Sequence, residues 1–339
     1  MIGERKVFHS LDIAKYVMAL MILVGHTANE WAHITGIWHY ILAFNFTVPA
    51  FFTISGFLFF NKFEQLQTSS EKTTYYRKWS LRIGRMYLIW SIIYVLLIIL
   101  KWCIFGVTMD IVVHNIHRWL LFSTYATIWF LPALWVGGSL IYLMYRYSSK
   151  MVLFVVTGVL WLIGVVMGAY PGLIRNEAIS TVVNIYDTYF FTFRNGFFYG
   201  SAYFLLGYCC HRMLDRFSLW QNIVGFIVFY LLFFGEAVMI HKLVKGPNTD
   251  MAMMMLPSVF FLVMAIARIK VPAHQCWSSL RNQSMLIFCG QRLFLTAIPA
   301  LLPTVFHQVQ SWPSLVIMIF FFVPVVLFAW LFDKLGWRI

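Results

Sequence analysis

Apolar runs of about 20 residues recur along the whole chain, and only short polar segments separate them. About 20 consecutive apolar residues allow an α-helix to cross the hydrocarbon core of a bilayer. The pattern predicts ten spans, at residues 11–30, 37–60, 82–100, 127–146, 151–169, 188–210, 219–240, 251–267, 284–306 and 313–332. They leave no room for a soluble domain. We therefore expect one all-α, polytopic integral membrane domain over residues 1–339.

Composition and charge support this prediction and orient the chain. The sequence is 61% apolar and only 11% charged, whereas soluble domains are about 25% charged. On the ten-span topology, most of the 25 Lys and Arg residues fall on the side of the N-terminus. This asymmetry predicts cytoplasmic N- and C-termini in a multi-pass protein of the cytoplasmic membrane. It also accounts for most of the net charge of +13, so we expect membrane lipid and no nucleic acid as a partner.

The first span carries ionisable residues along one stripe. In "LDIAKYVMALMILVGHT", Lys15 and His26 are eleven residues apart, close to three helical turns and about 16 Å along the axis. Glu30, four residues after His26, extends the stripe. Such a stripe should face a protein cavity, because exposure to lipid would be costly. We expect His26 to act as a general base and Glu30 to orient it. In the alternative interpretation, Lys15 only snorkels and His26 is a hydrogen-bonded core residue.

The segment "NKFEQLQTSSEKTTYYRKWSLRIGRMYLIW" predicts a basic interfacial helix from Tyr75 that leads into the third span. Its Arg82 and Arg85 are three residues apart and share a face, where they could bind phosphate with forked donors. An ordinary positive-inside anchor is the alternative. Two buried arginines, Arg194 and Arg292, need acidic, polar or anionic partners, and Gly196, Gly200 and Gly207 favour tight helix packing.

Further residues could face a substrate. Trp31 and Trp38 could stack on a sugar or belong to an aromatic belt at the membrane interface, and Asn45 and Ser55 could line the cavity. The five cysteines form neither a disulfide pattern nor a zinc pattern. We therefore expect no metal site.

These motifs together resemble acyltransferase family 3, the multi-span membrane O-acyltransferases of bacterial glycans. The resemblance rests on Lys15 and His26, on "VPAFFTISGFLFF", "RIGR" and "IWFLPAL", and it extends over nearly the whole chain. Two positions differ from the family pattern: Lys15 replaces the usual arginine, and "SMLIFCGQRLF" has Gln291 near the place of a histidine. Some relatives are membrane parts of serine racemases associated with resistance to glycopeptide antibiotics, for which amino-acid uptake is implied.

The resemblance implies an acetyl-CoA-dependent O-acetyltransferase that delivers an acyl group to a glycan or lipid-linked saccharide at the outer side. In this hypothesis Lys15, Arg82 and Arg85 bind the acyl-CoA, and His26 with Glu30 is catalytic, by general base catalysis or through an acyl-histidine. The acceptor would contact Asn45, Ser55, Trp31, Trp38, Arg194 and Arg292. A transporter of a small polar solute, such as an amino acid, is the rival hypothesis. An inactive scaffold is the third.

Overall fold

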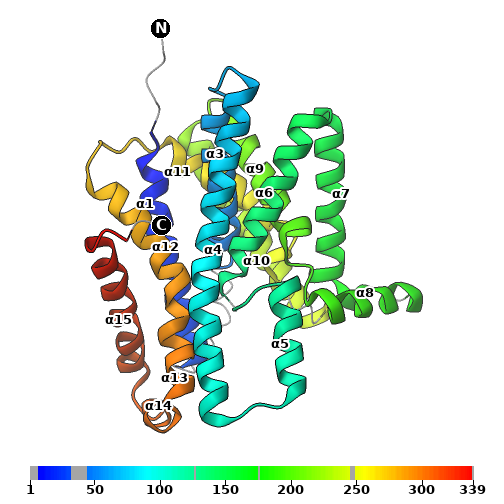
Figure 1. Ribbon diagram of the computed structural model, residues 1–339. Coiled ribbons are helices and arrows are strands. Elements are labelled where there is room, and N and C mark those ends of the chain that lie inside the picture. Colours follow the sequence, from blue (N-terminus) through cyan, green and yellow to red (C-terminus); the bar gives the residue numbers. More distant parts are fainter. Residues whose placement is uncertain (1–6, 32–43, 126, 175, 245–248, 338–339) are drawn as a thin grey trace.

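The computed structural model describes residues 7–31, 44–125, 127–174, 176–244 and 249–337, and these contain helices and turns but no strand. The chain forms a bundle of roughly parallel and antiparallel helices (Figure 1). The α-helices are α1 (His9–Glu30), α3 (Thr47–Phe63), α4 (Ser69–Phe105), α5 (Met109–Leu121), α6 (Phe130–Tyr147), α7 (Lys150–Ala169), α8 (Glu177–Phe190), α9 (Ser201–Met213), α10 (Leu219–Met239), α11 (Met255–Arg268), α12 (Cys276–Arg292), α13 (Ile298–Leu301), α14 (Pro303–Val309) and α15 (Ser314–Lys334).

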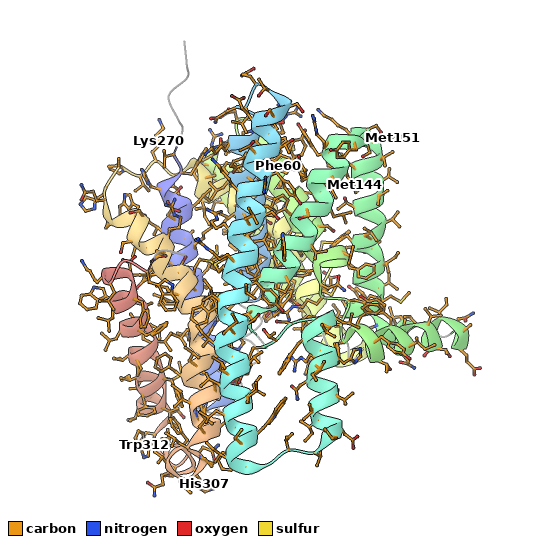
Figure 2. All side chains as sticks on the ribbon, viewed as in Figure 1. Phe60, Met144, Met151, Lys270, His307 and Trp312 are labelled. Carbon is orange, nitrogen blue, oxygen red and sulfur yellow. The ribbon has the colours of Figure 1, made fainter. Side chains whose placement is uncertain are left out.

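In the described part of the chain, seven helical segments are long and apolar enough to cross a membrane, and α11 is a shorter apolar helix. The all-α, polytopic prediction is therefore confirmed, whereas the count of ten spans and the cytoplasmic termini remain predictions. Figure 2 shows the two ends of the bundle: Lys270 and Met151 lie at one end, and His307 and Trp312 lie at the other.

The predicted interfacial helix and the third span are one continuous helix. Helix α4 has 37 residues, which corresponds to about 56 Å and exceeds the roughly 30 Å thickness of a bilayer core. A capping box begins it, in which the Thr68 side chain accepts from the Glu71 amide and the Glu71 side chain accepts from the Thr68 amide. No turn separates the basic segment from the apolar span, because the helix runs without interruption from Ser69 to Phe105.

The predicted span 188–210 is wrong at its start. Helix α8 ends at Phe190 and lies across the other helices (Figure 1), and Phe191 follows with a positive φ of 65°. The chain re-enters the bundle at a π-helical turn, Gly196–Gly200, whose first amides are capped by the Asn195 side chain. The apolar run continues across this break, so hydropathy alone does not reveal it. The span 284–306 also differs, because α12 begins earlier, at Cys276.

Close helix contacts hold the core. Helix α3 packs along α9, α10 along α11, and α1 along α12. A Cβ atom added to Gly207 would overlap the backbone of α3 at Thr53, Gly56 and Phe57, so glycine permits this backbone approach. A Cβ atom added to Gly196 or to Gly200 would likewise overlap the Ala133 carbonyl oxygen of α6. The predicted tight packing of this segment is confirmed, and it fixes α3 and α6, two of the helices that surround the cavities described next.

Candidate functional site

Lys15 and His26 belong to the same helix, α1, but they line two different cavities. The first, which we call the Lys15 cavity, has a volume of about 430 Å³ and is lined by residues of α1, α3, α4, α6, α12 and α15. The second, the His26 cavity, has a volume of about 520 Å³ and lies further along α1. Lys15 and His26 of the predicted stripe therefore face protein cavities, as expected from the cost of exposing charge to lipid, whereas Glu30 lines neither cavity.

The Lys15 cavity is cationic. Lys15, Arg82 and Arg281 line it, and Asp333 is the only carboxylate among its lining residues. Asp333 accepts hydrogen bonds from the Ser279 hydroxyl and, at 2.8 Å, from the Asn282 amide. Among the described residues, no carboxylate lies within ion-pair distance of Lys15, Arg82 or Arg281. The arrangement favours a ligand with several negative charges.

The predicted pair of arginines divides between two environments. Both residues are exposed, but Arg82 lines the Lys15 cavity and Arg85 does not. Residues three apart on a helix are offset by about 60°, enough to turn one side chain out of a narrow cavity. Arg281, near the start of α12, supplies the third cation. Sequence reasoning missed it because "SLRNQS" has no motif that points to phosphate.

Positive charge in the His26 cavity comes from three segments of the chain. Arg118, Arg194 and Arg292 line it with His26, and so do His114 and Asp187. Arg194 lies 3.0 Å from Asp250 and stacks over the Trp129 ring at 4.3 Å. Burial raises the pKa of the Asp187 carboxyl group. The predicted acceptor residues Arg194 and Arg292 thus lie beside His26.

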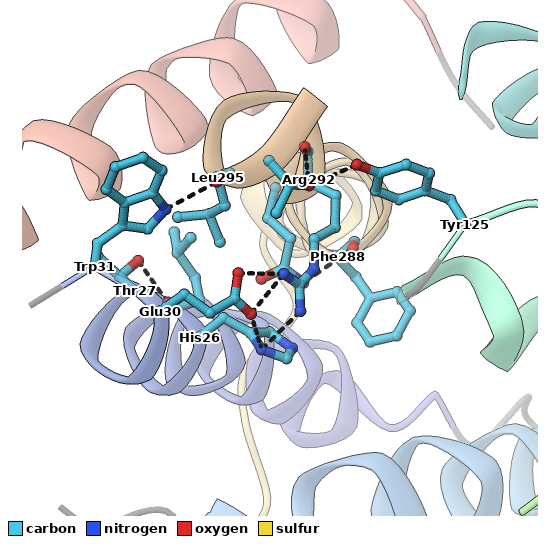
Figure 3. A network of polar contacts seen from close by, with 11 residues as sticks. His26, Thr27, Glu30, Trp31, Tyr125, Phe288, Arg292 and Leu295 are labelled. Atoms are coloured by element: carbon cyan, nitrogen blue, oxygen red, sulfur yellow. Dashed lines mark hydrogen bonds and ion pairs between the residues drawn. The ribbon is translucent and has the colours of Figure 1, made fainter. Parts of the chain in front are cut away.

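A three-residue network holds His26 (Figure 3). Arg292 of α12 donates to both carboxylate oxygens of Glu30, at 2.5 Å for Oε1, and its Nη2 lies 3.0 Å from His26 Nδ1. Glu30 Oε1 is 3.4 Å from the same ring nitrogen. The four-residue spacing of His26 and Glu30 correctly predicted their proximity. It contained no information about Arg292, which is 266 residues away.

The two contacts of His26 Nδ1 favour different tautomers. Arginine only donates, so its contact with Nδ1 requires a ring whose proton is on Nε2. The contact with Glu30 is a hydrogen bond when Nδ1 carries the proton, which leaves Nε2 free to accept a proton. The balance between Arg292 and Glu30 therefore decides whether His26 can act as a base.

A layer of aromatic rings separates the two cavities. Phe51 and Phe130 line the Lys15 cavity, and Phe288 lines the His26 cavity. The Phe288 ring lies 5.7 Å from the Phe51 ring and 5.3 Å from the Phe130 ring. All three side chains are at most 3% exposed. The contacts of Phe288 with Phe51 and Phe130 therefore join the wall of one cavity to the wall of the other.

The other predicted acceptor residues lie elsewhere. Ser55 lines the Lys15 cavity, where its hydroxyl donates to the Phe51 carbonyl at 2.7 Å, so it lies apart from the His26 cavity. The Trp31 indole donates to the Leu295 carbonyl at 2.8 Å, and its ring packs against Phe321. Asn45 donates to Thr249 at 2.9 Å. Neither Trp31 nor Asn45 is among the lining residues of the two cavities. Trp38 lies outside the described residues.

Comparison with known proteins assigns the chain to a family. The family model for the acyltransferase domain of acyltransferase family 3 matches residues 8–334. The chain belongs to acyltransferase family 3. A curated protein from Enterococcus faecalis, named amino-acid racemase, is 24% identical over 267 residues, which cover 75% of this chain and 35% of that protein. The chain thus spans about a third of the length of this curated relative. No solved structure gives a significant match.

In this member of acyltransferase family 3, the segments that carry the family resemblance surround the two cavities. From "VPAFFTISGFLFF", Val48 lines the His26 cavity and Phe51 the Lys15 cavity. From "IWFLPAL", Trp129 lines the His26 cavity and Phe130 the Lys15 cavity. Family membership supports an acyltransferase activity in a multi-pass membrane protein. Across the described residues, no group of three His, Cys, Asp or Glu side chains could hold a metal ion.

Proposed function

We propose that this protein transfers an acyl group, preferentially acetyl, from cytoplasmic acyl-CoA to a hydroxyl group of a glycan or lipid-linked saccharide at the outer face of the cytoplasmic membrane. The observation that carries the proposal is the pair of cavities on one helix, with a cationic pocket around Lys15 and a histidine network around His26. The positive-inside charge distribution supports a cytoplasmic position for the Lys15 cavity.

The Lys15 cavity suits the phosphate groups of CoA. The Arg82 and Arg281 guanidinium groups present planar, forked donors that can bind phosphate oxygens in pairs, and the Lys15 ammonium group adds a point charge. The substitution of lysine for the usual family arginine keeps the charge of the first-helix position while it removes one fork. Arg281 compensates for this loss within the same cavity.

His26 would supply the chemistry. With Nδ1–H donated to Glu30, His26 Nε2 accepts the proton of the acceptor hydroxyl as the oxygen forms a bond to the thioester carbonyl carbon. The tetrahedral intermediate then breaks its C–S bond. The CoA thiolate leaves and takes up the proton from His26 Nε2, so free CoA, the acyl ester and neutral histidine are the products. Arg292 would release Nδ1 during this cycle while it keeps its ion pair with Glu30.

The aromatic layer would control the path of the acyl group. The slender pantetheine arm of CoA is the part that could pass between Phe51, Phe130 and Phe288 toward His26. The rings would close again behind it and keep water away from the thioester. A closed layer between the two cavities fits an enzyme that must not hydrolyse its donor.

The experiment that tests this proposal measures acyl transfer and acetyl-CoA binding on the same purified sample in detergent. We expect His26→Ala to abolish transfer to a hydroxyl acceptor while calorimetric binding of acetyl-CoA stays at the wild-type level, because His26 does not line the Lys15 cavity. Wild-type transfer activity in His26→Ala would overturn the catalytic role of His26. The absence of acetyl-CoA binding in a folded wild-type sample would overturn the assignment of acetyl-CoA as the acyl donor.

The aromatic layer also favours a second function, transport of a small polar solute such as an amino acid. A closed layer between two cavities is typical of an occluded state in alternating access, and the three guanidinium groups of the His26 cavity could hold a carboxylate. Reconstituted vesicles separate the two functions. Uptake of a labelled amino acid without acetyl-CoA would favour transport. Uptake equal to that of empty vesicles would exclude transport of that amino acid.

A further inference from the structure

A third cavity lies beside the His26 cavity, between the end of α4, helix α5 and the segment after α12. It has a volume of about 380 Å³, and we call it the lateral cavity. Leu97, Ile98, Trp102 and Ile111 form much of its wall. Helices α4 and α5 touch where the Trp102 and Trp119 rings stack at 5.9 Å. The lateral cavity therefore has an apolar wall beside the site that holds His26, and Asn115, Thr124 and Thr296 add uncharged polar groups to its lining.

The lateral cavity and the His26 cavity share two arginines. Arg118 and Arg292 line both cavities, so the two spaces meet at these guanidinium groups. Lys101 lines the lateral cavity alone. Arg292 is neutralised by Glu30. Arg118 and Lys101 have no carboxylate within ion-pair distance among the described residues, so the junction carries uncompensated positive charge.

The surface around the lateral cavity is apolar. No residue of α5 is buried, and large apolar side chains are exposed on both flanking helices. They are Leu96, Ile99, Leu100 and Ile104 of α4 and Ile111, Ile116 and Leu120 of α5. An exposed apolar surface of this extent on a membrane protein faces lipid. The lateral cavity thus lies beside this apolar surface. It is lined by residues 97–102 of α4, near the C-terminal end of that helix, whereas the Lys15 cavity is lined by α4 residues between Tyr75 and Met86.

We propose that the lateral cavity binds the phosphate group and the first part of the hydrocarbon chain of a lipid-linked saccharide, which enters from the bilayer between α4 and α5. This inference rests on the proposed acyl transfer and selects the lipid-linked acceptor over a free glycan. Arg118 and Lys101 bind the phosphate, and the apolar wall binds the chain. The saccharide then lies in the His26 cavity, with a hydroxyl group next to His26.

The cations and the apolar wall of the lateral cavity match the two parts of such a ligand, its phosphate group and its hydrocarbon chain. A phosphate group between Arg118 and Lys101 restores charge balance and accepts forked hydrogen bonds from the guanidinium group. The hydrocarbon chain stays in an apolar environment, so entry does not require transfer of the lipid into water. A free glycan uses neither the apolar wall nor the two unpaired cations.

The test measures binding of radiolabelled farnesyl phosphate to the full-length protein in detergent, with farnesol and inorganic phosphate as competitors. We expect farnesyl phosphate to bind, both competitors to be weak, and Arg118→Ala to weaken binding by about 10- to 100-fold through loss of charged hydrogen bonds. Arg216→Ala is the matched control, because Arg216 is an exposed arginine outside all three cavities. Lys101→Ala gives a second variant on a different helix.

Several outcomes would overturn the inference. Equal binding of farnesyl phosphate by wild type, Arg118→Ala and Lys101→Ala would remove the phosphate site. If farnesol bound as tightly as farnesyl phosphate, the phosphate group would have no role in binding. If inorganic phosphate bound as tightly as farnesyl phosphate, the lipid chain would have no role. Lipid binding without acyl transfer would leave the site standing and refute the enzyme. Acyl transfer to a free saccharide as efficient as transfer to its farnesyl-phosphate-linked form would refute the site and leave the enzyme.

Discussion

Replacement of Glu30 by glutamine tests how the histidine network works. Glutamine keeps the shape of the side chain and one acceptor oxygen, but it removes the negative charge that Arg292 binds. The Arg292 side chain is only 9% exposed and the Glu30 side chain is 25% exposed. The variant therefore leaves a largely buried guanidinium group without its carboxylate.

The magnitude follows from the contacts. Hydrogen bonds to charged groups contribute about 1.5–3 kcal/mol each, and loss of one partner of a fully buried ion pair costs about 3–5 kcal/mol. Because water reaches Glu30 and glutamine retains one oxygen, we expect a loss of stability near the lower figure, about 1.5 kcal/mol. Unfolding of the purified protein in mixed detergent micelles measures this difference. The double variant Glu30→Gln, Arg292→Gln should be less destabilised than the sum of the two single variants.

The effect on catalysis should exceed the effect on stability. Without Glu30, Arg292 becomes the remaining charged partner of His26 Nδ1 and favours the tautomer with a proton on Nε2. General base catalysis contributes about 10²–10⁴-fold, so we expect kcat for acyl transfer to fall by about 10²-fold with an unchanged KM for acetyl-CoA. A destabilised variant with wild-type kcat would refute the reasoning, because it would show that Glu30 only anchors Arg292.

Two further predictions concern the donor path. We expect Arg281→Ala to weaken acetyl-CoA binding by about 10-fold or more, whereas Arg85→Ala should leave it nearly unchanged, because Arg281 lines the Lys15 cavity and Arg85 does not. Calorimetric titration measures acetyl-CoA binding by both variants. Equal effects of the two substitutions would contradict the Lys15 cavity as the phosphate site. We expect Phe288→Ala to raise acetyl-CoA hydrolysis in the absence of acceptor, because the opened aromatic layer admits water. Release of free CoA thiol measures the hydrolysis rate. An unchanged rate would contradict the role of the aromatic layer in excluding water from the thioester.

The pattern of residues along the sequence was sufficient to predict features that lie within one helix. Hydropathy showed that the protein is helical and integral to the membrane, and helical spacing placed Lys15, His26 and Glu30 on one face of α1. These properties depend on rise and rotation per residue, which are the same in every α-helix. Hydropathy was insufficient at the break after Phe190, because the apolar run continues while the backbone turns at Phe191.

Contacts between helices were decided only by the tertiary structure. Arg292 meets His26 and Glu30 across α12 and α1, and Arg281 joins Lys15 and Arg82 across three helices. The aromatic layer and the lateral cavity likewise form from segments distant in sequence. A buried charge in the sequence indicates that a partner is needed, but the partner depends on which helices pack together and at what rotation. The sequence by itself therefore determined that Arg292 needs an acidic, polar or anionic partner, and only the packing of α1 against α12 made that partner Glu30.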